Sequence, residues 1–154
     1  MINLEKIKRE LLIYTIVYGF VMVLIVFLTR IPNFLTNDNI INFYYKTNFN
    51  KNIIHDYLFI GIYLLIGIYI IKKFNIKNSM NQIFIIALVT IILTGGFMLY
   101  FQSKPKDYNT FFSVWFHTAS YKSIIYDIIL LVTTYLLYKF TKKELKLNKN
   151  LKLK

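Results

Sequence analysis

Four long apolar runs constrain the fold of this chain more than any other feature of its sequence. They cover about residues 11–29, 53–71, 83–101 and 118–140. The first run, Leu11–Thr29, contains no charged residue. At about 1.5 Å per residue a helix of this length extends about 28 Å, the thickness of a bilayer's hydrocarbon core. The runs predict an all-α integral membrane four-helix bundle with short loops, in which residues 1–154 form a single four-span domain.

The composition agrees with a membrane environment. Apolar residues occupy 56% of the 154 positions, more than is usual in a soluble domain. The net charge of +12 would suggest nucleic acid as the partner of a soluble protein, but here the cations flank apolar runs. The sequence has no cysteine, no glycine-rich phosphate loop and no Gly-x-Ser-x-Gly motif. We therefore exclude soluble enzymes and sequence-specific nucleic-acid binders, and we predict no cofactor.

The distribution of Lys and Arg predicts the orientation in the membrane. Three lie before the first run, three between the second and third, and seven after Leu137, whereas the other two connections together carry six. Because cytoplasmic flanks retain cations, we expect both termini on the cytoplasmic side. We also expect the basic tail, residues 141–154, to bind anionic lipid headgroups.

An aromatic segment precedes the last span. Residues Phe111–Phe116 read FFSVWF, which is too aromatic for an ordinary solvated loop. Trp and Tyr favour the headgroup level of a bilayer. The segment is therefore predicted either to lie in the interface or to extend the fourth helix outward, and the sequence leaves both alternatives open.

The predicted topology gathers ionisable side chains on the non-cytoplasmic face or in the outer leaflet. They are Asp38, His55, Asp56, Asp107, His117 and Asp127. Asp127 is the most informative of them, because an ionisable group inside a span is costly unless it faces the bundle and finds partners. Its predicted partners are Tyr63, Thr94, His55, His117 and Lys122.

Helical spacing places Asp127 in what we call the polar seam, a set of small and polar residues on the inward faces of three spans. On the fourth span the seam comprises Ser120, Ser123, Asp127, Thr134 and Tyr138. On the second and third spans it comprises Asp56, Tyr63, Gly67, Ala87, Thr90 and Thr94.

The seam has two interpretations. In the first, Asp127, His55, Asp56 and His117 form a proton relay, an ion site or a small catalytic pocket. A metal site is not predicted, because His55 and Asp56 are adjacent and point about 100° apart on a helix. In the second, which we favour, Asp127 bonds to Tyr and Thr hydroxyls and joins the helices. His117 is then an interfacial residue, and His55 and Asp56 form a solvated helix start.

Small residues in the second and third spans have a similar pair of interpretations. Thr94, Gly95 and Gly96 would let a neighbouring backbone approach closely or let the third helix break around a ligand. Gly61 and Gly67 are six positions apart and fall on different faces. Close packing within the chain is the simpler expectation.

The segment from Asn109 to Tyr138, NTFFSVWFHTASYKSIIYDIILLVTTYLLY, carries a family resemblance. Its Phe-Phe and Trp-Phe pairs, followed by Tyr126 and Asp127 at the start of the last helix, resemble small multi-pass membrane proteins encoded by nucleocytoplasmic large DNA viruses. The resemblance implies a virion or host internal membrane and assigns no catalytic residue.

These observations favour a structural or interaction component of a membrane, acting alone or as a homo- or hetero-oligomer through helix packing. The alternative is a small channel, a transporter subunit or a membrane enzyme that uses the polar seam around Asp127. Of these two, the enzyme class is the less favoured.

Overall fold

The computed structural model describes residues 4–36, 39 and 42–151, so Asp38 lies outside the described part of the chain. The described residues form helices and connections, with no strand among them. In chain order the elements are α1 (Leu4–Met22), η1 (Val23–Leu28), α2 (Ile31–Leu35), η2 (Phe43–Thr47), α4 (Phe49–Lys73), α5 (Ser79–Gln102), α6 (Phe111–Ala119) and α7 (Tyr121–Leu151).

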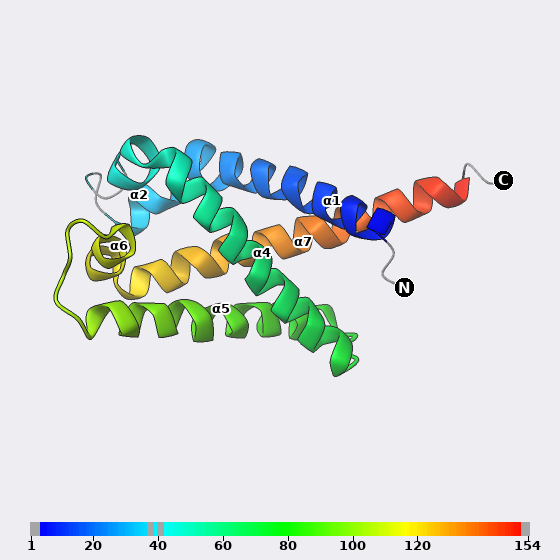
Figure 1. Cartoon of the computed structure of the whole chain (residues 1–154). Coiled ribbons are helices and arrows are strands. Elements are labelled where there is room, and N and C mark those ends of the chain that lie inside the picture. Colours follow the sequence, from blue (N-terminus) through cyan, green and yellow to red (C-terminus); the bar gives the residue numbers. More distant parts are fainter. Residues whose placement is uncertain (1–3, 37–38, 40–41, 152–154) are drawn as a thin grey trace.

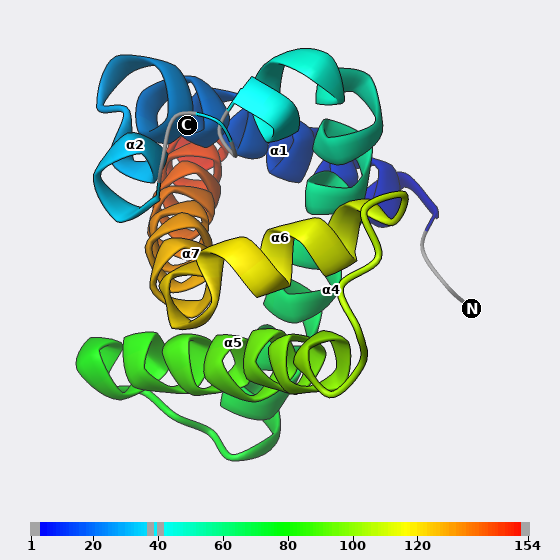
Figure 2. The same ribbon diagram turned by 90° about the vertical axis from the view of Figure 1, so that its left-hand side faces the viewer.

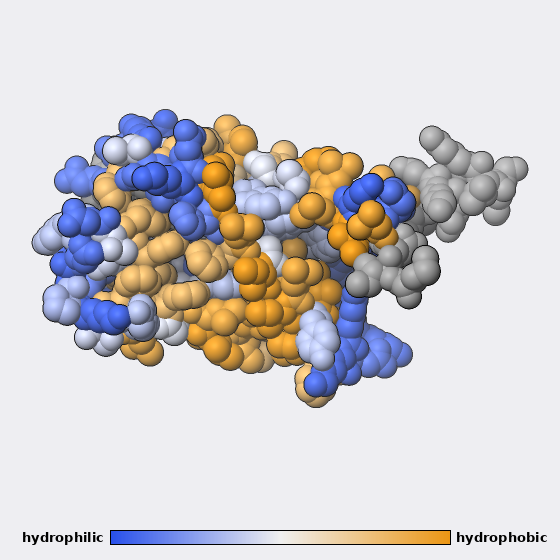
Figure 3. All heavy atoms as spheres, in the orientation of Figure 1, coloured by the Kyte–Doolittle hydropathy of each residue, from blue (hydrophilic) through white to orange (hydrophobic). Residues whose placement is uncertain are grey.

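Four of these helical segments are long and apolar enough to cross a membrane. They are Leu4–Leu28, Phe49–Lys73, Ser79–Gln102 and Tyr121–Leu145. They run along the length of the molecule (Figure 1), and a broad apolar band lies between more hydrophilic ends (Figure 3). The predicted all-α bundle is confirmed, and the chain has the architecture of a multi-pass membrane protein.

Helix α7 forms the centre of the packing. It contacts α1 on one side and α5 on the other, and α5 in turn contacts α4. Leu130 and Leu131 of α7 are almost completely buried, as are Val21 of α1 and Ile86 of α5. A helix with partners on several sides buries more than one apolar stripe, which explains why α7 carries buried polar residues as well as this core.

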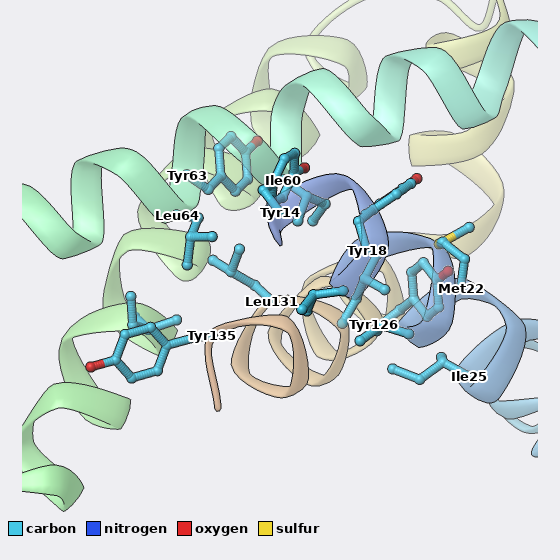
Figure 4. Packing of buried hydrophobic residues seen from close by; sticks show 14 of the residues in the cluster. Tyr14, Tyr18, Met22, Ile25, Ile60, Tyr63, Leu64, Tyr126, Leu131 and Tyr135 are labelled. Carbon is cyan, nitrogen blue, oxygen red and sulfur yellow. The ribbon is translucent and has the colours of Figure 1, made fainter. Parts of the chain in front are cut away.

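Tyrosines connect α1 to α4. The Tyr14 hydroxyl donates to the backbone oxygen of Tyr57, and the hydroxyls of Thr15 and Tyr57 are 2.8 Å apart. The Tyr14 and Tyr57 rings lie 4.9 Å apart between centroids. Gly61 makes room for this contact, because a Cβ there would lie 3.2 Å from the Tyr14 hydroxyl. Figure 4 shows Tyr14, Tyr18 and Tyr63 gathered in this part of the core.

The aromatic segment before the last span is a separate helix, α6, which crosses one end of the molecule near α5 and α7 (Figure 2). The break falls at Ser120, whose φ of 50° is unfavourable for a residue with a side chain. Gln102 stabilises the corner by donating to the Phe116 backbone oxygen at 3.0 Å and to the Ser120 hydroxyl at 3.1 Å.

Because of the break at Ser120, the fourth helix starts later than predicted. The sequence predicted this span at about 118–140, whereas α7 begins at Tyr121. At the other end α7 continues through residues 141–151, so this part of the basic tail is a helical extension of α7 and not a loop.

Candidate functional site between α4, α5, α6 and α7

A partly enclosed cavity of about 90 Å³ lies where α4, α5, α6 and α7 meet. Its lining is mostly aromatic, with two carboxyl groups and one phenol. The lining residues are Asp56, Phe59, Ile60, Tyr63, Phe97, Phe101, Phe112, Trp115, Phe116 and Asp127. Two of the four predicted site residues, Asp56 and Asp127, therefore face the same cavity from different helices.

Asp127 makes one hydrogen bond across the bundle. The Thr94 hydroxyl of α5 donates to Asp127 Oδ2 at 2.6 Å, which confirms Thr94 as a partner. The Tyr63 side chain interacts with the same threonine. Three helices thus meet at one small polar group, and Thr94 has no solvent-accessible surface.

Three other buried hydroxyls of the polar seam donate to backbone oxygens close to them in sequence. Thr90 donates to the Ile86 oxygen at 2.9 Å, and Thr134 donates to the Leu130 oxygen at 2.7 Å. Ser123 donates to the Ser120 oxygen at 2.6 Å. All three side chains are buried, as their place in the polar seam predicted. Each of these hydroxyls donates to a backbone oxygen three or four residues earlier in the sequence. Their hydrogen bonds therefore do not form a chain that leads away from Asp127.

His55 lies at the surface and is not part of the cavity lining. Its Nδ1 is 2.7 Å from the Lys51 backbone oxygen, so Nδ1 carries the proton and donates. Its ring meets Phe112 edge-on at 5.5 Å. Although His55 is adjacent to Asp56 in sequence, helical rotation turns the two side chains apart.

His117 is on α6 and also lies outside the cavity lining. Its Nε2 is buried and has no hydrogen-bond partner among the described residues. Neither histidine nor Lys122 hydrogen-bonds to Asp127, so these predicted partners are not brought to it in this structure.

The part of the chain that the structure describes contains no group of three or more His, Cys, Asp or Glu side chains placed to hold a metal ion. Asp56 and Asp127 are the only acids lining the cavity there, and the rest of the lining is aromatic or aliphatic. Hard cations prefer a larger number of oxygen ligands than these two carboxyl groups provide.

Asp107 has a local role in the turn before α6. Its carboxylate accepts from the Asn109 backbone N–H at 2.9 Å and from the Thr110 hydroxyl, while its own N–H donates to Ser113 Oγ at 2.9 Å. The Thr110 hydroxyl first, and then the Asn109 N–H, hold the pKa of Asp107 below its ordinary value. This acid therefore stabilises a turn and takes no part in the cavity.

Sequence reasoning missed a second polar region at the opposite end of the bundle. Glu10 of α1 accepts a hydrogen bond from the Tyr138 hydroxyl and forms an ion pair with Lys142 at 2.8 Å. Gln82 of α5 accepts from the Tyr135 hydroxyl and from Lys139, each at 2.7 Å. The sequence analysis pointed to this region only by including Tyr138 in the polar seam.

Gly67 allows close packing between helices, whereas Gly96 does not. A Cβ on Gly67 would clash with Ile86 Cδ1, whereas a Cβ on Gly96 would meet no atom within 4 Å. Helix α5 is continuous through Thr94, Gly95 and Gly96, so the third span is not broken at these residues.

The geometry is thus that of a helical membrane bundle with an internal cavity at the polar seam. No protein-family model, curated protein or solved structure matches this chain.

Proposed function

We propose that the chain is a structural or interaction component of a membrane, in which the polar seam joins helices. The observation that carries the proposal is the hydrogen bond between Thr94 and Asp127, which links α5 to α7 at the cavity. Thr90 and Thr134 donate within their own helices, and Ser123 donates to the Ser120 oxygen just before α7. A pathway for ions or protons would need polar groups that follow one another along the bundle.

The physical reason is the cost of an unpaired polar group in a bilayer. A hydroxyl or carboxyl group without a partner in hydrocarbon is unfavourable, so inward-facing polar side chains bond to each other or to a backbone oxygen. Hydrogen bonds between membrane helices are modest in strength, about 0.6 kcal/mol on average. One such bond orients α5 against α7 without needing any turnover chemistry.

An interaction role agrees with the outward faces of the helices, which are apolar over most of their length. Large exposed apolar side chains occur on every span, for example Phe20, Leu65, Ile92 and Leu136. In a bilayer these side chains meet lipid or a neighbouring helix. We propose the bilayer and a homo- or hetero-oligomer as the partners, and no nucleic acid.

For localisation we propose that both termini are cytoplasmic, which rests on the excess of Lys and Arg on that side of the spans. The resemblance of Asn109–Tyr138 to membrane proteins of large DNA viruses supports a virion or host internal membrane. A reporter fused after Lys154 tests the orientation: alkaline phosphatase should be inactive and a fluorescent protein bright, and the reverse pattern would overturn it.

One observation favours a second candidate, a small channel, transporter subunit or membrane enzyme. Asp56 and Asp127 approach the same cavity from α4 and α7, and the cavity has room for a few water molecules. Two carboxyl groups around water are a plausible site for a proton or a monovalent cation. This candidate requires Asp127 to act through its charge rather than through its hydrogen bond.

Reconstituted liposomes separate the two candidates. The purified full chain and its Asp127→Asn variant are tested for proton and potassium flux under an imposed potential, with Asp107→Asn as a control acid outside the seam. We expect all three proteins to match protein-free liposomes. Flux through the parent chain that is lost in a folded Asp127→Asn variant and kept in Asp107→Asn would overturn the structural role.

A further inference from the structure

At the end of the bundle opposite α6, an open hollow of about 350 Å³ lies between α4, α5 and α7. Figure 1 shows that the end of α4, the start of α5 and the later part of α7 lie on the same side of the molecule. Four lysines line the hollow, one from α4 and three from α7: Lys72, Lys139, Lys142 and Lys143. Its volume lies within the range of small-molecule sites in proteins.

Within the described chain, only one of these lysines forms an ion pair. Lys142 pairs with Glu10 at 2.8 Å. Lys139 donates to the neutral oxygens of Ser79 and Gln82. Lys72 interacts electrostatically with Glu10 but forms no hydrogen bond or ion pair with the described residues. Four lysines against one glutamate leave the hollow strongly cationic, and the mutual repulsion of the lysines would be relieved by an anion.

The remaining lining gives the hollow two unlike sides. Ile68 and Ile71 of α4 lie toward the membrane-spanning part: Ile71 directly precedes Lys72, and Ile68 lies about one turn before it. Tyr135, Tyr138 and Gln82 supply neutral polar groups beside the lysines. A ligand that fits both the lysines and the isoleucines has a negatively charged headgroup joined to an apolar chain.

We propose that this hollow binds the phosphate-bearing headgroup of an anionic membrane lipid. Lys72 and Lys139 would contact the phosphate, and Ile68 and Ile71 would contact the first part of the acyl chains. The site lies at a membrane-facing end of four spanning helices, where lipid headgroups are concentrated. The proposal is independent of whether the seam at the other end conducts ions. It goes beyond binding by the basic tail, because Lys72 of α4 and Lys139 of α7 lie outside the tail and line the same hollow as Lys142 and Lys143.

A simpler role for Lys72 is to complement the carbonyl end of α4, as cations in a last helical turn do. Lys73 lies in the same last turn but does not line the hollow, and Lys77 follows in the connection to α5. The pair Lys73 and Lys77 therefore offers a control with the same charge, at the same end of the molecule, outside the site.

The test is native mass spectrometry of the full chain in detergent, titrated with phosphatidylglycerol or with phosphatidylcholine. We expect preferential retention of phosphatidylglycerol by the parent chain. Removing one lysine charge should weaken binding about fivefold, so Lys72→Gln should lose about fivefold and the double variant Lys72→Gln, Lys139→Gln about 25-fold. Lys73→Gln with Lys77→Gln should remain within about twofold of the parent.

Lys139 also forms hydrogen bonds within the fold, so its substitution could disturb folding. Lys72 forms no such hydrogen bond, so Lys72→Gln alone tests the site without this complication. Three results would overturn the site: equal retention of the two lipids, equal losses in the Lys73 and Lys77 control, or full displacement of the lipid by inorganic phosphate. The last result would assign the lysines to a soluble phosphate compound.

Discussion

At the end of the bundle near α6, a cavity of about 90 Å³ is surrounded by aromatic rings and contains two carboxyl groups, whereas at the other end a hollow of about 350 Å³ is lined by four lysines. The first is partly closed by α6, and its polar contact is made between helices. The second is open, and only one of its four lysines forms an ion pair in the described chain.

A polar residue has a different role at the two ends of the bundle. A carboxyl group among phenyl rings must be satisfied by the protein, so it becomes part of the packing. A lysine at the end of a span reaches the headgroups, so it can remain without a protein partner. The two ends therefore predict different consequences of substitution.

The largest expected effect concerns packing at the closed end. Phe116 is buried on α6, and its ring stacks on Phe101 at 5.6 Å. Phe116→Ala should lower the free energy of unfolding by about 3 kcal/mol, through lost burial and an enlarged cavity. Denaturation in mixed micelles, followed by circular dichroism, measures it.

The matched variant at the open end is Ile68→Ala. Ile68 is only partly buried and borders the open hollow, so its loss should cost about 1 kcal/mol. Equal destabilisation by the two variants would contradict the difference between a packed end and an open end.

Much of this architecture could be predicted from the sequence, because the length of an apolar run decides whether a helix spans a bilayer. Helical periodicity also placed Thr94 and Asp127 on inward faces, and the structure joins them. Periodicity gives the rotation of a side chain only relative to its own helix. It therefore did not show that His55 and His117 lie away from Asp127.

Other features had no local signal. The break at Ser120 has a positive φ, which the identity of serine does not predict, and a hydrogen bond from Gln102 stabilises the corner. The contact between Glu10 and Tyr138 joins residues 128 positions apart. The lysine-lined hollow arises only when α4 and α7 are placed together, although the charges themselves were visible in the sequence.

A smaller effect is expected at glycines in the two halves of the bundle. Gly67 lies toward the open end and faces Ile86, which is fully buried and has little room to move. Gly67→Ala should lower the free energy of unfolding by about 1 to 2 kcal/mol through overpacking. Gly96→Ala, with open space around the new Cβ, should leave the stability unchanged or slightly raised. The same denaturation assay compares them, and a larger loss at Gly96 would contradict the packing described for α5.

The smallest effect concerns the exposed turn before α6. The pKa of Asp107 is lowered by the Thr110 hydroxyl and the Asn109 N–H, so the ionised form stabilises the turn. This stabilisation is present above the ordinary aspartate pKa of about 3.9 and is lost as the pH falls through the lower pKa of the folded state. The NMR shift of the Asn109 amide should titrate below about 3.9, and Thr110→Val should raise the midpoint. A midpoint unchanged by Thr110→Val would remove the hydroxyl as the cause.

The most direct test of the structural role is a double-mutant cycle on the hydrogen bond between Thr94 and Asp127. The parent chain, Thr94→Val, Asp127→Ala and the double variant are unfolded under the same micelle conditions. The structural account predicts a favourable coupling energy of about 1 kcal/mol, within the range known for hydrogen bonds between membrane helices. Coupling indistinguishable from zero, in variants that all fold, would show that the two residues do not join α5 to α7 and would contradict the account.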